Sequence, residues 1–279
     1  MTPMRAVALP DGIAVPAVGQ GTWRMGEDSR RAKAEIAALR AGIELGMTLV
    51  DTAEMYGDGA TETLVGEALA GLRDRVFLVS KVYPHNAGAG RIERACEQSL
   101  KRLKTDRLDL YLLHWRGAVP LAETVERMEA LVAAGKIARW GVSNLDADDM
   151  QELFDAGGEA CATNQVLYNI GERGVEFDLL PMLSDRGIPT MAYSPIAQGR
   201  LPRSAALAAV AERHGVTPYQ AALAFVLRDP TVIAIPKAGD VAHVEANHRA
   251  LDLRLSPEDL AALDADFPPP RAKTPLAML

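Results

Sequence analysis

The sequence predicts an α/β fold, a (β/α)8 or TIM barrel with a β-hairpin at its start. Short apolar runs recur eight times along the 279 residues, and amphipathic segments separate them. Near-continuous apolar character is typical of parallel strands that are buried on both faces. Strand and helix units repeated eight times are the pattern of a barrel with its helices outside. No linker or low-complexity stretch interrupts the pattern, so we expect a single domain over residues 1–279.

The eight strand candidates share an apolar run that ends in polar residues. They are residues 16–23, 47–53, 76–82, 108–115, 138–144, 161–168, 189–196 and 231–238. Segments with helical spacing lie between them, among them residues 30–46, 121–134 and 146–154. Thr217-Pro218 and Ser256-Pro257 each resemble a helix N-cap followed by proline at the first helical position.

Both ends of the chain carry features outside this repeat. Residues 5–9 and 13–15 flank Pro10-Asp11-Gly12, which predicts a hairpin with a positive φ at Gly12. Such a hairpin would plug the N-terminal end of the barrel. The proline-rich segment after Phe267 is expected to form a terminal arm over the barrel.

The composition is that of a globular enzyme. A formal net charge of -7 argues against nucleic acid as a partner, because no excess of Lys or Arg is present to neutralise phosphates. Two cysteines favour a reducing compartment. Residues 1–10 lack the apolar run of a signal peptide, and no segment is apolar enough to span a membrane. We therefore expect a cytoplasmic protein, and a monomer because no apolar stripe is left over.

Each predicted strand ends in polar or special residues. Because the carboxyl ends of barrel strands meet on one face, we expect these residues to form a shared site. They are Gly21, Thr22, Trp23, Asp51, Lys81, His114, Ser143, Asn144, Gln165, Tyr193, Ser194 and Lys237.

Four side chains at this rim could transfer a proton to a carbonyl group: Asp51, Tyr56, Lys81 and His114. A phenol is too weakly acidic to donate readily at neutral pH. The ammonium of Lys81 would lower the pKa of Tyr56 and make it a general acid, and Asp51 would hold Lys81 in place. A neutral His114 could orient the carbonyl oxygen by a hydrogen bond. No metal is needed, and a separate group would deliver a hydride.

The hydride donor would bind in the C-terminal third of the chain. No Gly-x-Gly-x-x-Gly motif is present, so a Rossmann-type site is not indicated. The flat face of Tyr193 could stack on a nicotinamide ring, and Ser143, Asn144 and Gln165 could bond its carboxamide. Arg200 and Lys237 are the candidate phosphate cations, in keeping with phosphate sites near the last strands of barrels.

The chain resembles the aldo-keto reductase family nearly end to end. The motifs that carry this resemblance are VGQGTW, DTAEMYGDG, LVSKV, YLLHW, GVSN, NQV, YSPI and AIPKAGDVAHVEAN. They are most similar to a short-looped bacterial branch that includes methylglyoxal reductases. The resemblance implies the roles given above for Tyr56, Lys81, Asp51 and His114.

The resemblance also implies an extended NADP(H) site and an aromatic substrate pocket. The implied cofactor residues are Asp51, Ser143, Asn144, Gln165, Tyr193, Ser194, Pro195, Ile196, Arg200, Pro236, Lys237 and Asn247, with Gly21 and Thr22 at the end of the first strand. Trp23, Tyr83 and Trp115 match the walls of the substrate pocket, beside His114.

Two positions at the cofactor site depart from the family pattern. Many members have a hydroxyl residue directly after the lysine at position 237, and an arginine six positions after that lysine that clamps the 2′-phosphate. Here these positions hold Ala238 and His243. Because Lys237 remains, we expect NADPH to be preferred, with weaker discrimination against NADH.

Short loops after His114 and Tyr193 predict an open pocket and broad specificity for small carbonyl compounds, such as methylglyoxal-like dicarbonyls and activated aldehydes. Two alternatives stay open. A metal-dependent hydrolase would need clustered histidines, and only His114 lies at a strand end. The chain could also bind NADPH as a redox sensor or regulatory subunit with little turnover.

Overall fold

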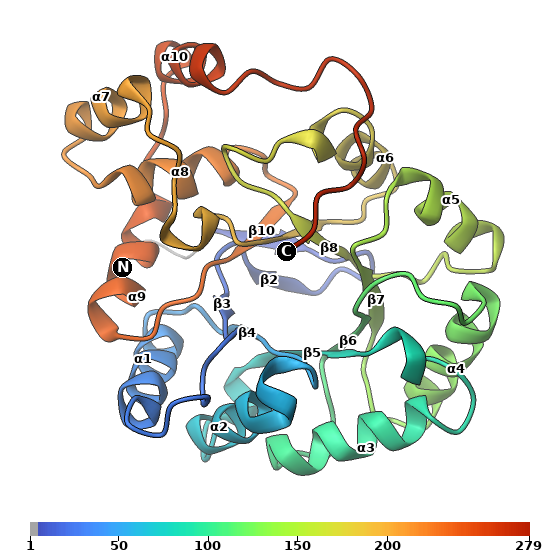
Figure 1. Ribbon diagram of the computed structural model, residues 1–279. Coiled ribbons are helices and arrows are strands. Elements are labelled where there is room, and N and C mark those ends of the chain that lie inside the picture. The colour runs from blue at the N-terminus through green and yellow to red at the C-terminus, as the bar shows by residue number, and fades with distance from the viewer. Residues whose placement is uncertain (1–4) are drawn as a thin grey trace.

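Eight parallel strands form a closed barrel at the centre of the computed structural model, which describes residues 5–279 (Figure 1). The strands follow chain order around the sheet from β3 to β10. Bridges from Val18 to Ala234 and from Gly21 to Lys237 join the two edges. The predicted (β/α)8 barrel is therefore confirmed.

Each predicted apolar run contains one barrel strand, and each strand is shorter than its run at one or both ends. The strands are β3 (Gln20–Gly21), β4 (Leu49–Asp51), β5 (Phe77–Val82), β6 (Leu110–Leu113), β7 (Trp140–Ser143), β8 (Asn164–Leu167), β9 (Thr190–Tyr193) and β10 (Val232–Ile235). All but the first residue of β5 and the last of β9 are buried, which explains why these segments are almost continuously apolar.

Helices surround the barrel (Figure 1). They are α1 (Ala32–Glu44), α2 (Ala60–Ala68), α3 (Ile92–Leu103), α4 (Leu121–Ala133), α5 (Ala147–Asp155), α6 (Leu179–Asp185), α7 (Ala205–Arg213), α8 (Pro218–Val226), α9 (Val241–Arg249) and α10 (Pro257–Asp266). Thr217 and Ser256 cap α8 and α10 through capping boxes, as their sequence pattern predicts. Asp146 caps α5 in the same way.

A two-stranded hairpin, β1 (Ala6–Ala8) and β2 (Ala14–Pro16), lies at the N-terminal end of the barrel. Its turn contains Gly12 with φ 85°, as predicted. Asp11 pairs with Arg139, which directly precedes β7. Residues 1–4, which belong to the segment considered above for a signal peptide, lie outside the described residues.

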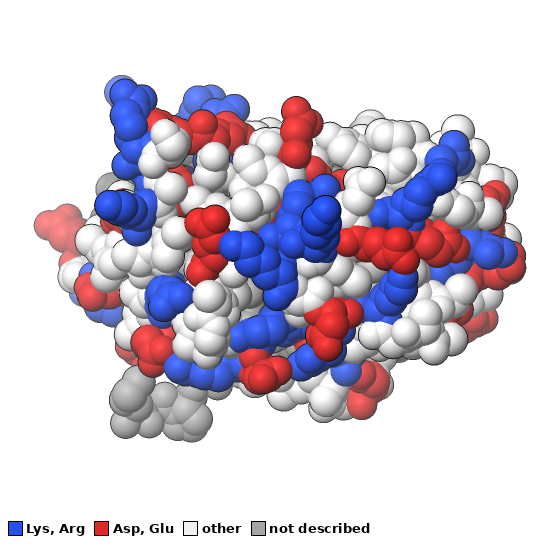
Figure 2. Space-filling view, turned by 90° about the horizontal axis from the view of Figure 1, so that it is seen from below, with Lys and Arg blue, Asp and Glu red and all other residues white. Residues whose placement is uncertain are grey.

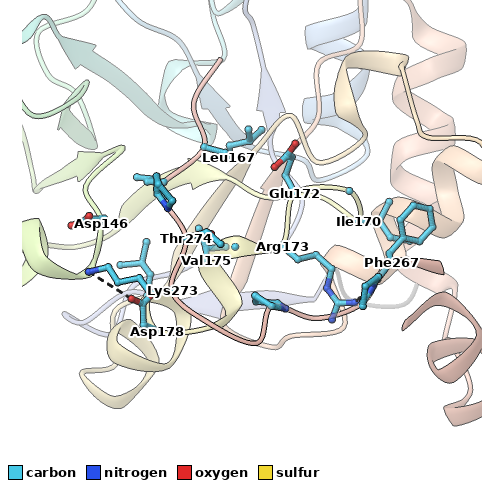
Figure 3. Close-up of a pocket in the computed structure, with 18 of the residues that line it drawn as sticks. Asp146, Leu167, Ile170, Glu172, Arg173, Val175, Asp178, Phe267, Lys273 and Thr274 are labelled. Atoms are coloured by element: carbon cyan, nitrogen blue, oxygen red, sulfur yellow. Dashed lines mark hydrogen bonds and ion pairs between the residues drawn. The ribbon is translucent and has the colours of Figure 1, made fainter. Parts of the chain in front are cut away.

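The C-terminal arm begins at Phe267 and ends near the centre of the opposite, C-terminal face of the barrel (Figure 1). Lys273 anchors it by an ion pair with Asp148 at 2.6 Å. Lys273 also lies 3.9 Å from Asp178, the contact drawn as a dashed line in Figure 3. Beneath the arm is a cavity of about 500 Å³ that Arg173 also lines. The expected arm is present, and its last two residues reach the cleft described below.

Acidic and basic side chains are interspersed on the face shown in Figure 2 and do not gather into one continuous basic surface. In the part of the chain that the structure describes, no helix has both the length and the apolar character needed to cross a membrane.

Candidate active site

A cleft of about 680 Å³ opens at the C-terminal ends of the barrel strands. Most of the residues predicted from the sequence line it: Gly21, Thr22, Trp23, Asp51, Tyr56, His114, Trp115, Ser143, Asn144, Gln165, Tyr193, Ser194, Pro195, Ile196, Arg200, Lys237, His243 and Asn247. Of the remaining candidates, Lys81 lies buried beside the cleft, while Tyr83, Pro236 and Ala238 are not part of its lining.

Lys81 is the centre of a buried hydrogen-bond cluster. It projects from β5 and is fully buried. Its Nζ donates to Oδ2 of Asp51 at 2.7 Å, to the carbonyl oxygen of Thr52 at 2.9 Å and to Oη of Tyr56 at 3.0 Å. An ammonium has three N–H donors, so these three acceptors satisfy it completely. The lysine is thus held in one position between a carboxylate and a phenol.

The ionisation of this cluster follows from burial and from its own charges. Burial disfavours the charged form of Lys81, but the adjacent Asp51 and Tyr56 outweigh it, and the pKa of Lys81 is raised. Burial also raises the pKa of Tyr56, and Lys81 opposes this shift without reversing it. The expectation from sequence that Lys81 lowers the pKa of Tyr56 below its usual value is therefore wrong in this structure, because desolvation is the larger effect.

The phenol of Tyr56 consequently keeps its proton at neutral pH. A proton donor needs this starting state. The charge of Lys81, 3.0 Å from the phenol oxygen, would stabilise the phenolate that remains after transfer. In a proton transfer from Tyr56, Lys81 would therefore stabilise the phenolate product more than it would acidify the phenol.

His114 is buried and neutral. Burial, together with the charge of Lys81, lowers the pKa of His114 to about 2. Its ring lies 5.9 Å from the ring of Tyr56, measured between centroids. Its Nδ1 is buried and has no hydrogen-bond partner among the described residues. We assign the proton to Nε2, because a bare acceptor at Nδ1 avoids burying an unpaired N–H group.

Amide and hydroxyl groups form the neighbouring part of the cleft. Tyr193 Oη donates to Oδ1 of Asn144 at 3.0 Å, and Asn144 Nδ2 donates to the carbonyl oxygen of His114 at 3.1 Å. Gln165 Nε2 donates to Oδ1 of Asp51 at 2.7 Å. Asn144 has a positive φ of 57°, a conformation that Asn adopts more readily than most residues. These bonds connect the ends of β6, β7 and β9 to one another, and β8 to the end of β4.

Aromatic rings also border the cleft. Trp115 packs against His114 at 4.9 Å and against Tyr83 at 5.8 Å, measured between ring centroids. Trp23 stays partly exposed at the mouth, and the guanidinium of Arg24 lies 4.5 Å from its ring centroid. Tyr83 therefore supports the wall through Trp115.

Glu54 is a supporting residue that sequence reasoning missed. It is buried, and its Oε1 accepts from the backbone N–H of Tyr83 at 2.7 Å and from Nδ2 of Asn86 at 3.2 Å. It thereby fixes the loop after β5 beside the segment that carries Tyr56. Glu54 lies between Asp51 and Tyr56 in the sequence, and this position could have indicated that it belongs to the site.

Further lining residues were also missed: Arg24, Met55, Gln198, Gly199, Thr217, Tyr219, Gln220, Ile235, Ala246, Met278 and Leu279. Thr217 and Gln220 carry a recognisable capping pattern, which gave no reason to expect that this helix start faces the cleft. Met278 and Leu279 carry no pattern at all, and only the path of the C-terminal arm brings them there.

Residues 5–279 contain no group of three or more His, Cys, Asp or Glu side chains that could hold a metal ion. Nothing observed therefore favours the metal-dependent hydrolase alternative.

Comparisons with known proteins agree with this geometry. Residues 17–266 match the model of the aldo/keto reductase family. Methylglyoxal reductase YeaE of Escherichia coli (strain K12) is 57% identical to this chain, with 99% of both chains covered. The crystal structure of an aldo/keto reductase from Klebsiella pneumoniae in complex with NADP and acetate is 55% identical, with a TM-score of 0.96, and covers 99% of this chain and 100% of its own. The thermostable aldo-keto reductase Tm1743, solved in complex with epalrestat, is 40% identical with a TM-score of 0.90 and covers 94% of this chain and 99% of its own. The chain belongs to the aldo/keto reductase family.

Proposed function

We propose that this protein reduces small aldehydes and ketones to alcohols with NADPH as cofactor. The observation that carries the proposal is the position of Lys81 Nζ, bonded at once to Asp51 and to the Tyr56 phenol beside a cleft that also contains His114. This arrangement holds a proton at the phenol oxygen and charge next to it, which are the requirements for protonating a carbonyl group as it is reduced.

The residues of the cleft fit NADPH. The hydroxyl of Ser143 and the side-chain amides of Asn144 and Gln165 match the hydrogen-bonding capacity of a carboxamide. The ring of Tyr193 offers a flat apolar face, and Lys237 and Arg200 supply positive charge farther along the same cleft. When bound, NADPH supplies the hydride.

The protein's own groups have separate tasks in the reaction. His114, neutral and with its proton on Nε2, donates a hydrogen bond that orients the carbonyl oxygen. Tyr56 donates its proton to that oxygen, and Lys81 stabilises the resulting phenolate. Asp51 keeps Lys81 charged in its buried position. Trp23 and Trp115 limit the access of water to the reacting groups.

The substrates proposed are methylglyoxal-like dicarbonyls and activated aldehydes. The cleft of about 680 Å³ must hold both the cofactor and the substrate, so little volume remains for a bulky compound. The similarity to a bacterial methylglyoxal reductase supports the same choice.

An NADPH-oxidation assay over a panel of carbonyl compounds tests this function. We expect the highest kcat/KM with small dicarbonyls and activated aldehydes, and a higher value with NADPH than with NADH. A preference for a steroid would contradict the substrate class, and an equal or higher kcat/KM with NADH would contradict the cofactor preference.

A monomeric state and a cytoplasmic location stay predictions of the same proposal, as does the single domain. Size-exclusion chromatography with light scattering checks the first, and a mass near 29.9 kDa is expected.

A further inference from the structure

Two cations from distant parts of the chain, Arg31 and Lys237, lie close together, and Lys237 also lines the cleft. An ideal Cβ built on Gly239 would lie 2.7 Å from Nη2 of Arg31 and 3.2 Å from Nζ of Lys237. Both nitrogens therefore border the same small volume, which the missing side chain of Gly239 leaves open. Arg31 directly precedes α1 and Lys237 follows β10; α1 and α9 are neighbours in the barrel (Figure 1).

Neither of these two cations has a carboxylate within hydrogen-bond distance among residues 5–279. The carboxylate nearest to Arg31 is Glu35, whose Oε1 lies 3.8 Å from Nε, beyond hydrogen-bond distance. Lys237 has no ion pair within 4 Å among residues 5–279. Burial lowers the pKa of Lys237, the charge of Arg31 adds to this shift, and Glu35 and Asp240 oppose it without reversing it. Such an arrangement is stabilised when an anion binds between the two groups.

His243 does not supply that positive charge. Its Nδ1 lies 2.7 Å from Oδ2 of Asp240, the residue that caps α9, so the imidazole is turned to a carboxylate of its own helix. His243 is therefore paired within its own helix and adds no second cation beside Lys237. Arg31 reaches the same region from another element of the barrel.

We propose that Arg31, together with Lys237, binds the 2′-phosphate of NADP(H) and determines the preference for NADPH over NADH. The inference rests on the proposed function. It assigns cofactor discrimination to the segment between β3 and α1, where the sequence has cations in Arg24, Arg30 and Arg31. The exposed guanidinium can move onto a bound phosphate, since more than half of its side-chain surface faces solvent.

Isothermal titration calorimetry with NADP⁺ and NAD⁺ tests the inference, because these two ligands differ only in the 2′-phosphate. Arg31→Met should weaken NADP⁺ binding by about tenfold, the effect of losing one charge-assisted hydrogen bond. NAD⁺ binding should change by about twofold or less, and Arg31→Lys should restore part of the NADP⁺ affinity. The adjacent Arg30→Met is a matched control, because Arg30 is exposed and paired with Asp28; it should alter neither affinity.

The outcomes separate this inference from the function on which it rests. If the wild-type protein binds NADP⁺ but Arg31→Met binds both ligands as the wild type does, the inference is wrong and the proposed function stands. An equal loss of NADP⁺ and NAD⁺ affinity would also overturn it. If the wild-type protein binds neither dinucleotide, both proposals fail.

Discussion

The ammonium of Lys81 donates a hydrogen bond of 3.0 Å to the phenol of Tyr56, although the two residues are 25 positions apart in the chain. Both are held there by the barrel: β5 carries the lysine, and a 3₁₀ turn after β4 carries the tyrosine. Neighbouring parallel strands end at the same rim, so a contact of this kind needs no long-range loop. The same ammonium forms an ion pair with Asp51 on β4. The stability of the protein and the position of the phenol therefore depend on the same buried cluster.

Removing Lys81 should therefore destabilise the protein as well as inactivate it. Lys81→Met leaves the buried carboxylate of Asp51 without its partner, and we expect a loss of about 3–5 kcal/mol in the free energy of unfolding. The double variant Lys81→Met/Asp51→Asn carries no unpaired charge and should be more stable than Lys81→Met alone. Urea unfolding measures four proteins, the wild type, Lys81→Met, Asp51→Asn and the double variant. Additive losses in the double variant would show that the pair is not coupled.

His114 should make the folded protein sensitive to acid. Its pKa is lowered to about 2 in the folded state, whereas an unfolded imidazole has a pKa near 6.5. Below pH 6.5 the unfolded chain takes up a proton that folded His114 does not. His114 therefore does not reduce the free energy of unfolding above about pH 6.5. Below that pH, the free energy of unfolding falls by up to about 1.4 kcal/mol per pH unit as the pH drops toward 2.

Urea unfolding at pH 7 and at pH 4.5 measures this dependence. His114→Gln should lose less stability between these two pH values than the wild type does. Tyr56→Phe is the matched control, because it alters the same cleft without removing the imidazole and should keep the wild-type difference. An unchanged pH dependence in His114→Gln would contradict the account of a buried neutral histidine.

Gly21 should be required for closure of the barrel. An added Cβ would lie 2.7 Å from the carbonyl oxygen of Ile235, a backbone atom of the strand that closes the ring. Gly21→Ala must push β3 and β10 apart, and we expect a loss of about 1–3 kcal/mol in the free energy of unfolding. NADPH should also bind more weakly, since Lys237 pairs with Gly21 across this seam. A variant with wild-type stability would refute the close packing at this position.

The sequence was sufficient to predict the fold and most of the cleft because both depend on local patterns. Apolar runs marked the eight strands, and the polar residue at the end of each run marked the rim. In a parallel barrel, these two facts alone place Asp51, Lys81 and His114 together. The pKa of Tyr56 was predicted in the wrong direction, since the balance between burial and a neighbouring charge depends on how deeply the phenol lies.

Residues whose position depends on packing between distant segments could not be predicted. Arg31 reaches Lys237 because α1 packs beside α9, and no periodicity in either helix indicates that neighbour. Met278 and Leu279 line the cleft only because the C-terminal arm crosses the face of the barrel. Glu54 was overlooked because a carboxylate that bonds a backbone N–H has no distinctive spacing.

The most direct test of the account compares wild-type protein with Tyr56→Phe in methylglyoxal reduction and in NADPH binding. The variant loses only the phenol oxygen that Lys81 contacts. We predict that kcat/KM falls by about 10²- to 10⁴-fold, the usual contribution of a general acid, while the NADPH dissociation constant from fluorescence quenching stays nearly unchanged. A variant as active as the wild type would contradict the role of Tyr56, and a wild-type protein that binds NADPH but reduces no carbonyl compound would favour a redox sensor over an enzyme.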